Sequence, residues 1–163
     1  LLGEGLGTHV FGITTRVEKR LSAWVLGQLI LMLFIGGIVY LVLFFLGIEF
    51  AIPLAVLAGL FEMVPTVGPI LSAIPAILVA FSHSPMLALS VLAFYIIVQQ
   101  VENNILVPFI MKRSVGLSPV LTILALMIGG RFGGIAGAIL AVPILLTIQE
   151  IIVSGPKSTL GTS

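Results

Sequence analysis

The chain has 163 residues, of which 60% are hydrophobic and only 8% charged, whereas roughly 25% of the residues in an ordinary soluble domain are charged. Its mean hydropathy of +1.33 excludes a soluble globular domain. A formal charge of +1 leaves no basic surface for nucleic acid, and the lack of cysteine excludes disulfides and thiolate chemistry. We therefore expect an all-α integral membrane protein whose surroundings are the lipid bilayer.

The N-terminal region predicts a helix that leads into the membrane from the cytoplasm. Residues 1–21 place apolar side chains at helical spacing around Arg16, Lys19 and Arg20. Basic residues beside a first span mark the cytoplasmic side of a membrane. Residues 22–46 then predict the first transmembrane helix, because the 28 residues that follow Arg20 carry no charge and about 20 apolar residues suffice to cross a bilayer.

Residues 50–81 predict a broken helical hairpin. The apolar stretch is interrupted at Pro53 and again at the sequence PTVGP, so neither piece has the length that a span needs. The residues expected to break the helix are Pro65, Gly68 and Pro69. A pair of tilted, kinked spans is the alternative interpretation. Both return the chain to the side of the membrane that it left.

Residues 86–111 predict a second long helix, which carries a polar stripe. Five polar side chains interrupt otherwise apolar sequence: Gln99, Gln100, Glu102, Asn103 and Asn104. A central carboxylate in lipid costs roughly 2.5 kcal/mol or more, so we expect these side chains to face protein or water and to line a pathway. Pro108, which follows one turn later, is expected to weaken the helix. Lys112 and Arg113 close the helix and place its end in the cytoplasm.

Residues 117–153 repeat the pattern of a short helix, a break and a return. A short apolar piece is followed by the sequence GGRFGG and then by an apolar helix. The residues expected to form this second break are Gly129, Gly130, Arg131, Gly133 and Gly134. Small residues at every fourth position predict close helix packing, in one row of Gly130, Gly134 and Ala138 and a second of Gly133, Gly137 and Ala141. Residues 154–163 form a polar tail. Paired interrupted segments of this kind point to a transporter binding site.

Three of these motifs, in this order, carry a family resemblance. They are EMVPTVGPILSAIPA at 62–76, YIIVQQVENNILVPFIM at 95–111 and VGLSPVLTILALMIGGRFGGIAGAILAVP at 115–143. They resemble the C-terminal half of the AI-2E family of bacterial membrane transporters. The resemblance implies a multi-pass, homo-oligomeric protein of the bacterial inner membrane, linked to export of the quorum-sensing signal autoinducer-2 or to sodium/proton exchange. Since Leu1 is not an initiator methionine, we expect the N-terminal half to be missing.

The predicted function is secondary transport of a small polar solute or cation. Glu62 and Glu102 are the acidic residues that we place in apolar sequence, and we expect one of them, Glu102 first, to bind a coupling proton or sodium ion. Glu62 has the alternative of capping or pairing within its hairpin. We expect no other cofactor and no metal.

Catalysis is not expected, because the chain lacks Asp and has no nucleophile, phosphate-loop or paired-histidine motif. A sodium/proton antiporter and a non-transporting membrane scaffold are the alternatives. In a scaffold, Asn and Gln side chains would join helices, at about 1 kcal/mol for each hydrogen bond.

Overall fold

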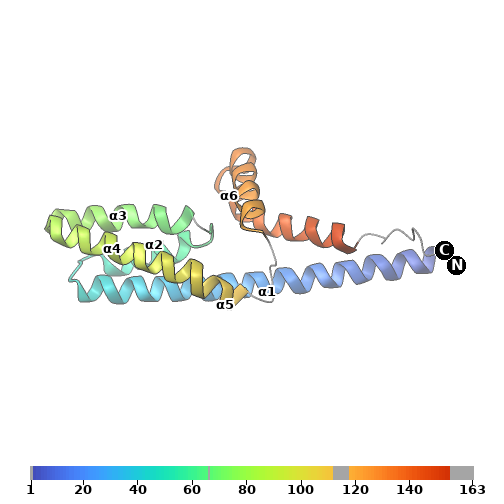
Figure 1. Cartoon of the computed structure of the whole chain (residues 1–163), viewed down its shortest axis with the longest axis horizontal. Helices are drawn as coiled ribbons and strands as arrows, with labels where there is room; N and C mark the ends of the chain where they lie inside the picture. The colour runs from blue at the N-terminus through green and yellow to red at the C-terminus, as the bar shows by residue number, and fades with distance from the viewer. Residues whose placement is uncertain (1, 66, 112–117, 155–163) are drawn as a thin grey trace. The chain divides into compact units, whose positions relative to one another are not determined.

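The computed structural model describes residues 2–65, 67–111 and 118–154, and every regular element within these ranges is helical (Figure 1). This confirms the all-α prediction. Helices suit lipid because each one satisfies its own backbone hydrogen bonds. The elements are α1 (Leu2–Phe45), α2 (Ala51–Phe61), α3 (Val67–His83), α4 (Pro85–Val101), the π-helical turn η1 (Glu102–Leu106), α5 (Val107–Met111) and α6 (Pro119–Ser154).

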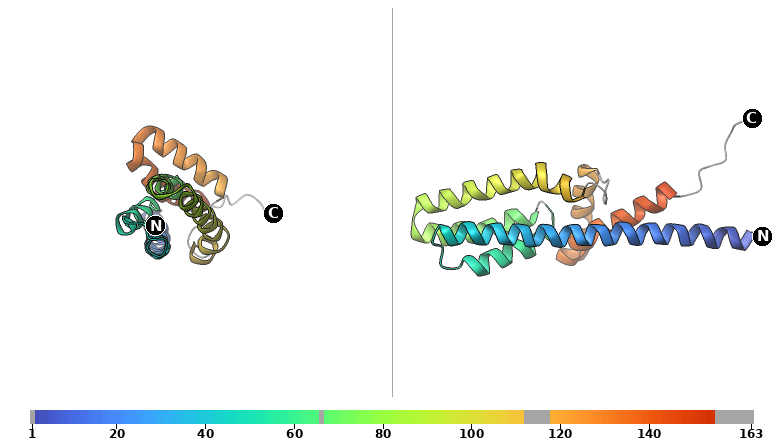
Figure 2. Two further views of the ribbon diagram at one scale, coloured as in Figure 1. Left: turned by 90° about the vertical axis from the view of Figure 1, so that its left-hand side faces the viewer. Right: turned by 90° about the horizontal axis from the view of Figure 1, so that it is seen from below.

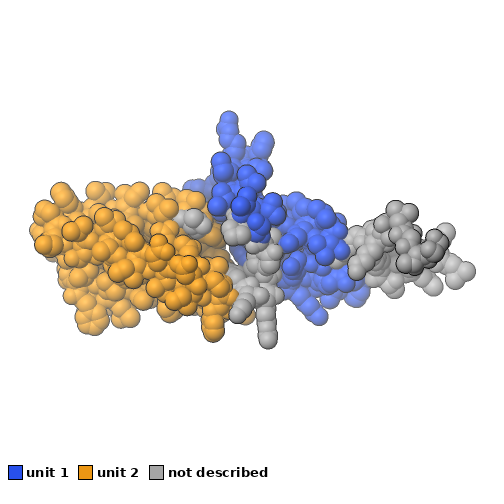
Figure 3. Space-filling view, in the orientation of Figure 1, with its two compact units in different colours: residues 1–24, 114–163 blue, residues 25–113 orange. Residues whose placement is uncertain are grey.

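Three stretches are long and apolar enough to cross a membrane, namely Phe11–Phe45, Pro85–Ile110 and Val120–Val153. Many large apolar side chains on these helices are exposed, including Leu33, Phe45 and Phe109. Such a surface suits contact with lipid or with further transmembrane helices. The chain divides into two compact units, residues 25–113 and residues 1–24 with 114–163 (Figure 3).

α1 is one continuous helix of 44 residues, about 66 Å long at 1.5 Å per residue. The predicted lead-in at 1–21 and the predicted span at 22–46 are therefore parts of the same helix. The helix ends where Gly47 adopts a left-handed backbone with φ of 73°, a conformation that glycine adopts without steric cost. The amide of Ile48 then donates to the carbonyl of Leu43 at 2.9 Å.

Small residues bring the helices of the 25–113 unit close together. A Cβ on Gly59 of α2 would lie 2.8 Å from the carbonyl oxygen of Met32 on α1, so only glycine permits this approach. α3 packs against both α2 and α4 (Figure 2). The core contains alanines from all three of these helices: Ala51, Ala55, Ala58, Ala76, Ala80 and Ala88.

The region predicted as a broken hairpin at 50–81 forms two packed helices, α2 and α3, but Pro53 does not interrupt it. Pro53 lies in the first turn of α2, where the missing N–H of proline would have no helical partner in any case. The break lies between α2 and α3 and includes Pro65, whereas Gly68 and Pro69 belong to the first turn of α3. α3 has 17 residues and is longer than the sequence pattern suggested.

The second long helix changes its winding at Glu102. α4 starts with Ser84 as its N-cap, whose side chain accepts a hydrogen bond from the amide of Leu87. In η1 the amide of Val107 bonds to the carbonyl of Glu102, five residues earlier. A following proline explains this wide turn, because the ring of Pro108 would press on the carbonyl four residues before it in an α-helix. The chain then continues as α5.

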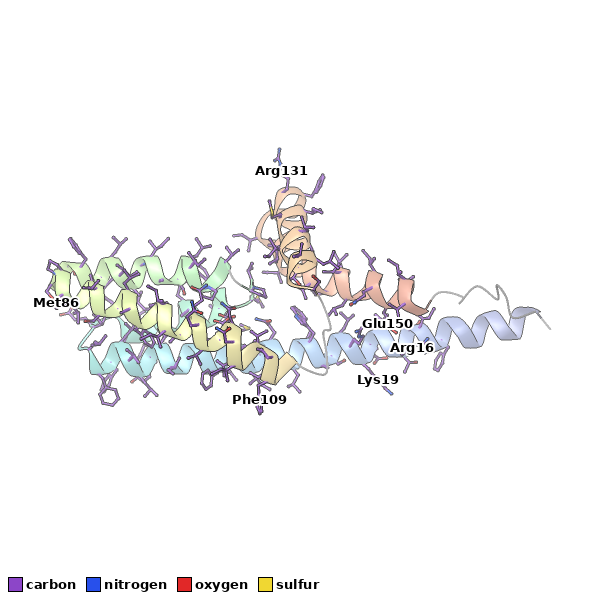
Figure 4. The ribbon with its side chains drawn as sticks, viewed as in Figure 1. Arg16, Lys19, Met86, Phe109, Arg131 and Glu150 are labelled. Carbon is purple, nitrogen blue, oxygen red and sulfur yellow. The ribbon has the colours of Figure 1, made fainter. Side chains whose placement is uncertain are left out.

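α6 is bent back on itself at Gly134, where φ is 57° and ψ is −141°. A Cβ on Gly129 would lie 2.3 Å from the carbonyl oxygen of Gly137. In a straight helix these two residues would be about 12 Å apart along the axis. Arg131 lies at the tip of the bend (Figure 4). The stretch Val120–Val153 thus has the length of a span, yet it consists of two arms that meet at their glycines.

The break in α6 is narrower than predicted. Only Gly134 among the five expected break residues has a non-helical backbone. The other four, which are helical, are Gly129, Gly130, Arg131 and Gly133. Of the two predicted packing rows, Gly137 and Ala141 lie against Gly129, as close packing requires, whereas nothing lies within 4 Å of a Cβ on Gly130 or Gly133. One left-handed glycine is sufficient to reverse the chain.

Replacing Gly129 by alanine should separate the two arms of α6. The new methyl group would meet backbone atoms that cannot rotate away, so we expect destabilisation by about 1–3 kcal/mol, the usual cost of overpacking. Thermal unfolding of the purified protein in detergent measures the effect. Gly130→Ala is the matched control, because its Cβ enters open space. Equal melting temperatures for the two variants would contradict the close approach of the two arms at Gly129 and Gly137.

Several predicted features lie outside the described residues. Lys112 and Arg113, which are expected to mark a cytoplasmic helix end, belong to this group. Two further features also lie outside them: Leu117, where the predicted 117–153 hairpin starts, and nearly all of the polar tail at 154–163.

Candidate functional site

Among the described residues of the 25–113 unit, five polar side chains are buried, and we call them the polar cluster: Gln28, Glu62, Ser72, Tyr95 and Glu102. They come from α1, the end of α2, α3, α4 and η1 respectively. Glu62 is 1% exposed and Glu102 is 2% exposed. Burial of an acidic side chain is costly unless a partner or a bound cation compensates it, so these two residues need an explanation.

Glu62 is held through its backbone. It is the C-cap residue of α2, and its own amide donates to the carbonyl of Ala58 at 3.1 Å. The side-chain amide of Gln28 donates to the main-chain carbonyl of Glu62, which at a helix end has no partner within the helix. The other amide atom of Gln28, Oε1, is buried and has no hydrogen-bond partner.

The side chains of Glu62 and Glu102 lie close enough to interact electrostatically. Each also has a buried Oε2 atom without a partner. Carboxylates only accept hydrogen bonds, so two of them in contact have nothing to donate. Two like charges about 4 Å apart repel by roughly 4 kcal/mol at an effective dielectric constant near 20. A proton or a cation between them would remove this repulsion.

The described residues of the 25–113 unit include no lysine or arginine that could pair with these carboxyls. No Lys or Arg occurs between Arg20 and Lys112. In the described part of the 25–113 unit, the other groups that can carry charge are Glu49 and His83, and both are exposed. No three His, Cys, Asp or Glu side chains gather as a metal site among the described residues of the chain.

Ser72 and Tyr95 form a second part of the polar cluster. The Ser72 hydroxyl donates to the carbonyl of Pro69, one helical turn earlier, at 3.0 Å. Tyr95 faces Ser72, although no hydrogen bond of good geometry reaches the buried Tyr95 hydroxyl. Tyr95 and Glu102 are seven residues apart on one helix, which places them about two turns apart on one face. The two parts of the cluster therefore follow the same face of α4.

The predicted polar stripe is only partly buried in the structure. Glu102 points inward and is buried, Gln99 is half-buried, and the remaining members are exposed: Gln100, Asn103 and Asn104. The side-chain amide of Asn104 donates to the carbonyl of Gln100 at 2.7 Å and approaches its side-chain oxygen at 3.2 Å. The stripe is thus a surface beside the polar cluster, and Glu102 is the member that joins the two.

The tertiary structure brings into the site residues that the sequence pattern does not indicate, namely Gln28, Ser72 and Tyr95. Gln28 had a visible signal, because it is a polar residue within the uncharged run after Arg20. Glu150 also lies in apolar sequence, so the prediction that placed only Glu62 and Glu102 there was incomplete.

Glu150 of α6 forms ion pairs with α1 inside the other unit. Its Oε2 lies 2.9 Å from Nη1 of Arg20, and its Oε1 lies 3.3 Å from Nε of Arg16. Figure 4 shows Glu150 and Arg16 facing each other, with Lys19 on another side of α1. The Glu150 side chain is only 9% exposed, so this acidic residue is compensated by arginine while Glu62 and Glu102 face each other.

Comparison with known proteins places the chain among transporters. The family model described as AI-2E family transporter matches residues 2–157. YueF of Bacillus subtilis, assigned to transport by its name, is 35% identical over 150 residues, which are 91% of this chain and 40% of YueF. The AI-2 transport protein TqsA of Escherichia coli K12 is 34% identical over 115 residues, which are 70% of this chain and 33% of TqsA.

YrrI, a second Bacillus subtilis protein assigned to transport, is 35% identical over 84% of this chain and 39% of its own length. The chain thus spans about two fifths of the length of these relatives. No solved structure matches it.

Proposed function

Because the chain belongs to the AI-2E family of transporters, we propose that the protein moves a small polar solute across the bacterial inner membrane by secondary transport. Autoinducer-2 is the first candidate solute, since TqsA is named as an AI-2 transport protein. Sodium/proton antiport is the second candidate. The bacterial origin of the relatives supports the proposed membrane.

The polar cluster is the observation that carries this proposal. It places two acidic side chains, an amide and two hydroxyl groups in the interior of apolar helices. Intramembrane ionisable residues are rare, and they generally face a pathway or a water-filled cavity. A scaffold needs polar contacts that are fully paired, whereas several buried atoms of this cluster have no partner. Unpaired groups suit a site that binds and releases a ligand.

The two bent elements support the same proposal. We propose that the α2–α3 pair and the two arms of α6 enter the membrane and return to the side that they left. Broken helices at membrane depth are typical of transporter binding sites. The cluster residue Glu62 lies at the first of these breaks. We also propose that several copies of the protein associate, using the exposed apolar faces of their helices.

A double substitution tests transport against the scaffold alternative. Replacing Gln99 and Asn103 by leucine should lower solute flux by at least about tenfold, or roughly 1.4 kcal/mol in the barrier, because the surface beside the polar cluster loses its polar groups. Assembly and expression should stay normal, since Asn103 is exposed and Gln99 is only half-buried. Flux of labelled autoinducer-2 and of other small polar solutes is measured in proteoliposomes that contain the intact protein.

Ser90→Leu is the matched control, because Ser90 is an exposed polar residue on α4. It should leave flux unchanged. If the double variant instead assembles poorly, and the part that does assemble transports at the wild-type rate, the result supports the scaffold interpretation and refutes the pathway interpretation. A solute-independent exchange of sodium for protons in the wild type would favour antiport over export.

A further inference from the structure

We infer that Gln28, Glu62 and Glu102 form a binding site for one monovalent cation, either a proton or a sodium ion. Within the proposed function this would be the coupling ion, and Gln28 is a member that the sequence pattern did not indicate. Gln28 lies on α1, Glu62 caps the end of α2 and Glu102 begins η1, and these elements are separate in sequence. A cation bound between them would join three elements of the 25–113 unit.

The donor atoms support this assignment. Gln28 Oε1, Glu62 Oε2 and Glu102 Oε2 are all buried, and none has a hydrogen-bond partner. Gln28 is 4% exposed, so water outside the protein does not satisfy its oxygen. All three atoms are hard oxygen ligands, which suit protons and alkali or alkaline-earth cations better than soft transition metals.

Gln28 is positioned to present its oxygen. Its amide nitrogen is engaged by the main-chain carbonyl of Glu62, and this bond settles which end of the amide is the donor. The side-chain oxygen is therefore left as an acceptor beside the Glu62 end of α2. An acceptor that is buried without a donor costs about 1–3 kcal/mol, and a bound cation would offset that cost.

The number of ligands points to a monovalent ion. Calcium takes about six to eight oxygen ligands and magnesium about six in strict octahedral geometry, whereas these residues offer three buried oxygens without partners. One positive charge is also enough to remove the repulsion between two carboxylates. The other members of the polar cluster on the neighbouring helices, Ser72 of α3 and Tyr95 of α4, are uncharged.

The test is a labelling experiment that needs no transported solute. Dicyclohexylcarbodiimide modifies protonated carboxyl groups in apolar surroundings, and peptide mass spectrometry locates the modified residue. In the intact purified protein we expect modification at Glu62 or Glu102. Glu49 is the control, because its carboxyl is exposed in the connection between α1 and α2 and should remain unmodified.

The two candidate ions give different results. If sodium binds, increasing sodium concentration at constant pH should protect the carboxyl pair from the reagent, whereas potassium should not. If the site is specific for protons, labelling should fall as the pH rises and should not respond to sodium. Either result supports the site. The absence of labelling at Glu62 and Glu102 at every pH would overturn it.

The variant Gln28→Met tests the third ligand. It keeps the length and the apolar packing of the side chain but removes the oxygen, so the sodium concentration for half-protection should rise about tenfold, or the pH for half-labelling should move by about one unit. An unchanged value would remove Gln28 from the site. If this variant does not fold, labelling of the wild-type protein still decides whether the carboxyl pair binds a cation.

Failure of this inference can be told apart from failure of the proposed function. Solute flux without labelling would overturn the cation site and leave the transporter. Labelling without flux of any solute would support the cation site and overturn solute transport.

Discussion

Substituting Glu102 by glutamine should lower gradient-driven flux by about 5- to 150-fold, which corresponds to the usual coupling free energy of roughly 1–3 kcal/mol. Glutamine keeps the shape of the side chain and most of its hydrogen-bonding capacity, but it cannot ionise. The substitution also removes the repulsion between Glu62 and Glu102, so folding should survive. Solute or cation flux in proteoliposomes, driven by an imposed pH or sodium gradient, measures the effect.

Glu49→Gln is the matched control, because Glu49 is exposed in the connection between α1 and α2. It should retain wild-type flux. If Glu102→Gln also transports normally, Glu102 has no coupling role. That role would then pass to Glu62, which Glu62→Gln tests in the same assay, or ion coupling would not use this part of the protein.

Substituting Gly68 by alanine should have the largest effect on stability. A Cβ at this position would lie 1.8 Å from the carbonyl oxygen of Phe61 and 3.1 Å from the amide nitrogen of Glu62. Both are backbone atoms, so α3 would have to move away from the end of α2. We expect destabilisation of about 3 kcal/mol, at the upper end of the usual overpacking range, and a strongly reduced yield of folded protein.

Gly37→Ala is the control for this substitution, because no heavy atom lies within 4 Å of its Cβ. Alanine in a helix interior is favoured over glycine by up to about 1 kcal/mol, so this control should be neutral or slightly stabilised. Thermal unfolding and size-exclusion chromatography in detergent measure both variants. A normal yield and melting temperature for Gly68→Ala would mean that the α2–α3 connection relaxes without cost.

Gly68 also connects stability to function. It lies against the Glu62 end of α2, and Ser72 follows one turn later on the same helix. Any movement of α3 at Gly68 would therefore shift Glu62 relative to Ser72 and the rest of the polar cluster. If sodium binds to the site, sodium should no longer protect Glu62 and Glu102 from the carbodiimide in a Gly68→Ala protein that still retains its helical content.

The sequence by itself determined that this is an all-helical membrane protein and where its long apolar stretches lie. These properties are local, because a helix in lipid satisfies its own backbone hydrogen bonds and its length follows from the number of apolar residues. The break near Pro65 could likewise be predicted, since proline lacks the amide hydrogen that a continuing helix needs. The family resemblance also depended on proline and glycine residues that interrupt the apolar helices.

Only the tertiary structure decided which polar residues share a site. Helical periodicity placed Gln99, Glu102 and Asn103 on one face, but in the structure Glu102 is buried, Gln99 is half-buried and Asn103 is exposed. Gln28 and Glu62 belong to helices that meet because Gly59 lets α2 approach α1. A contact between residues far apart in the chain depends on how the helices pack, and single-sequence periodicity carries no information about that packing.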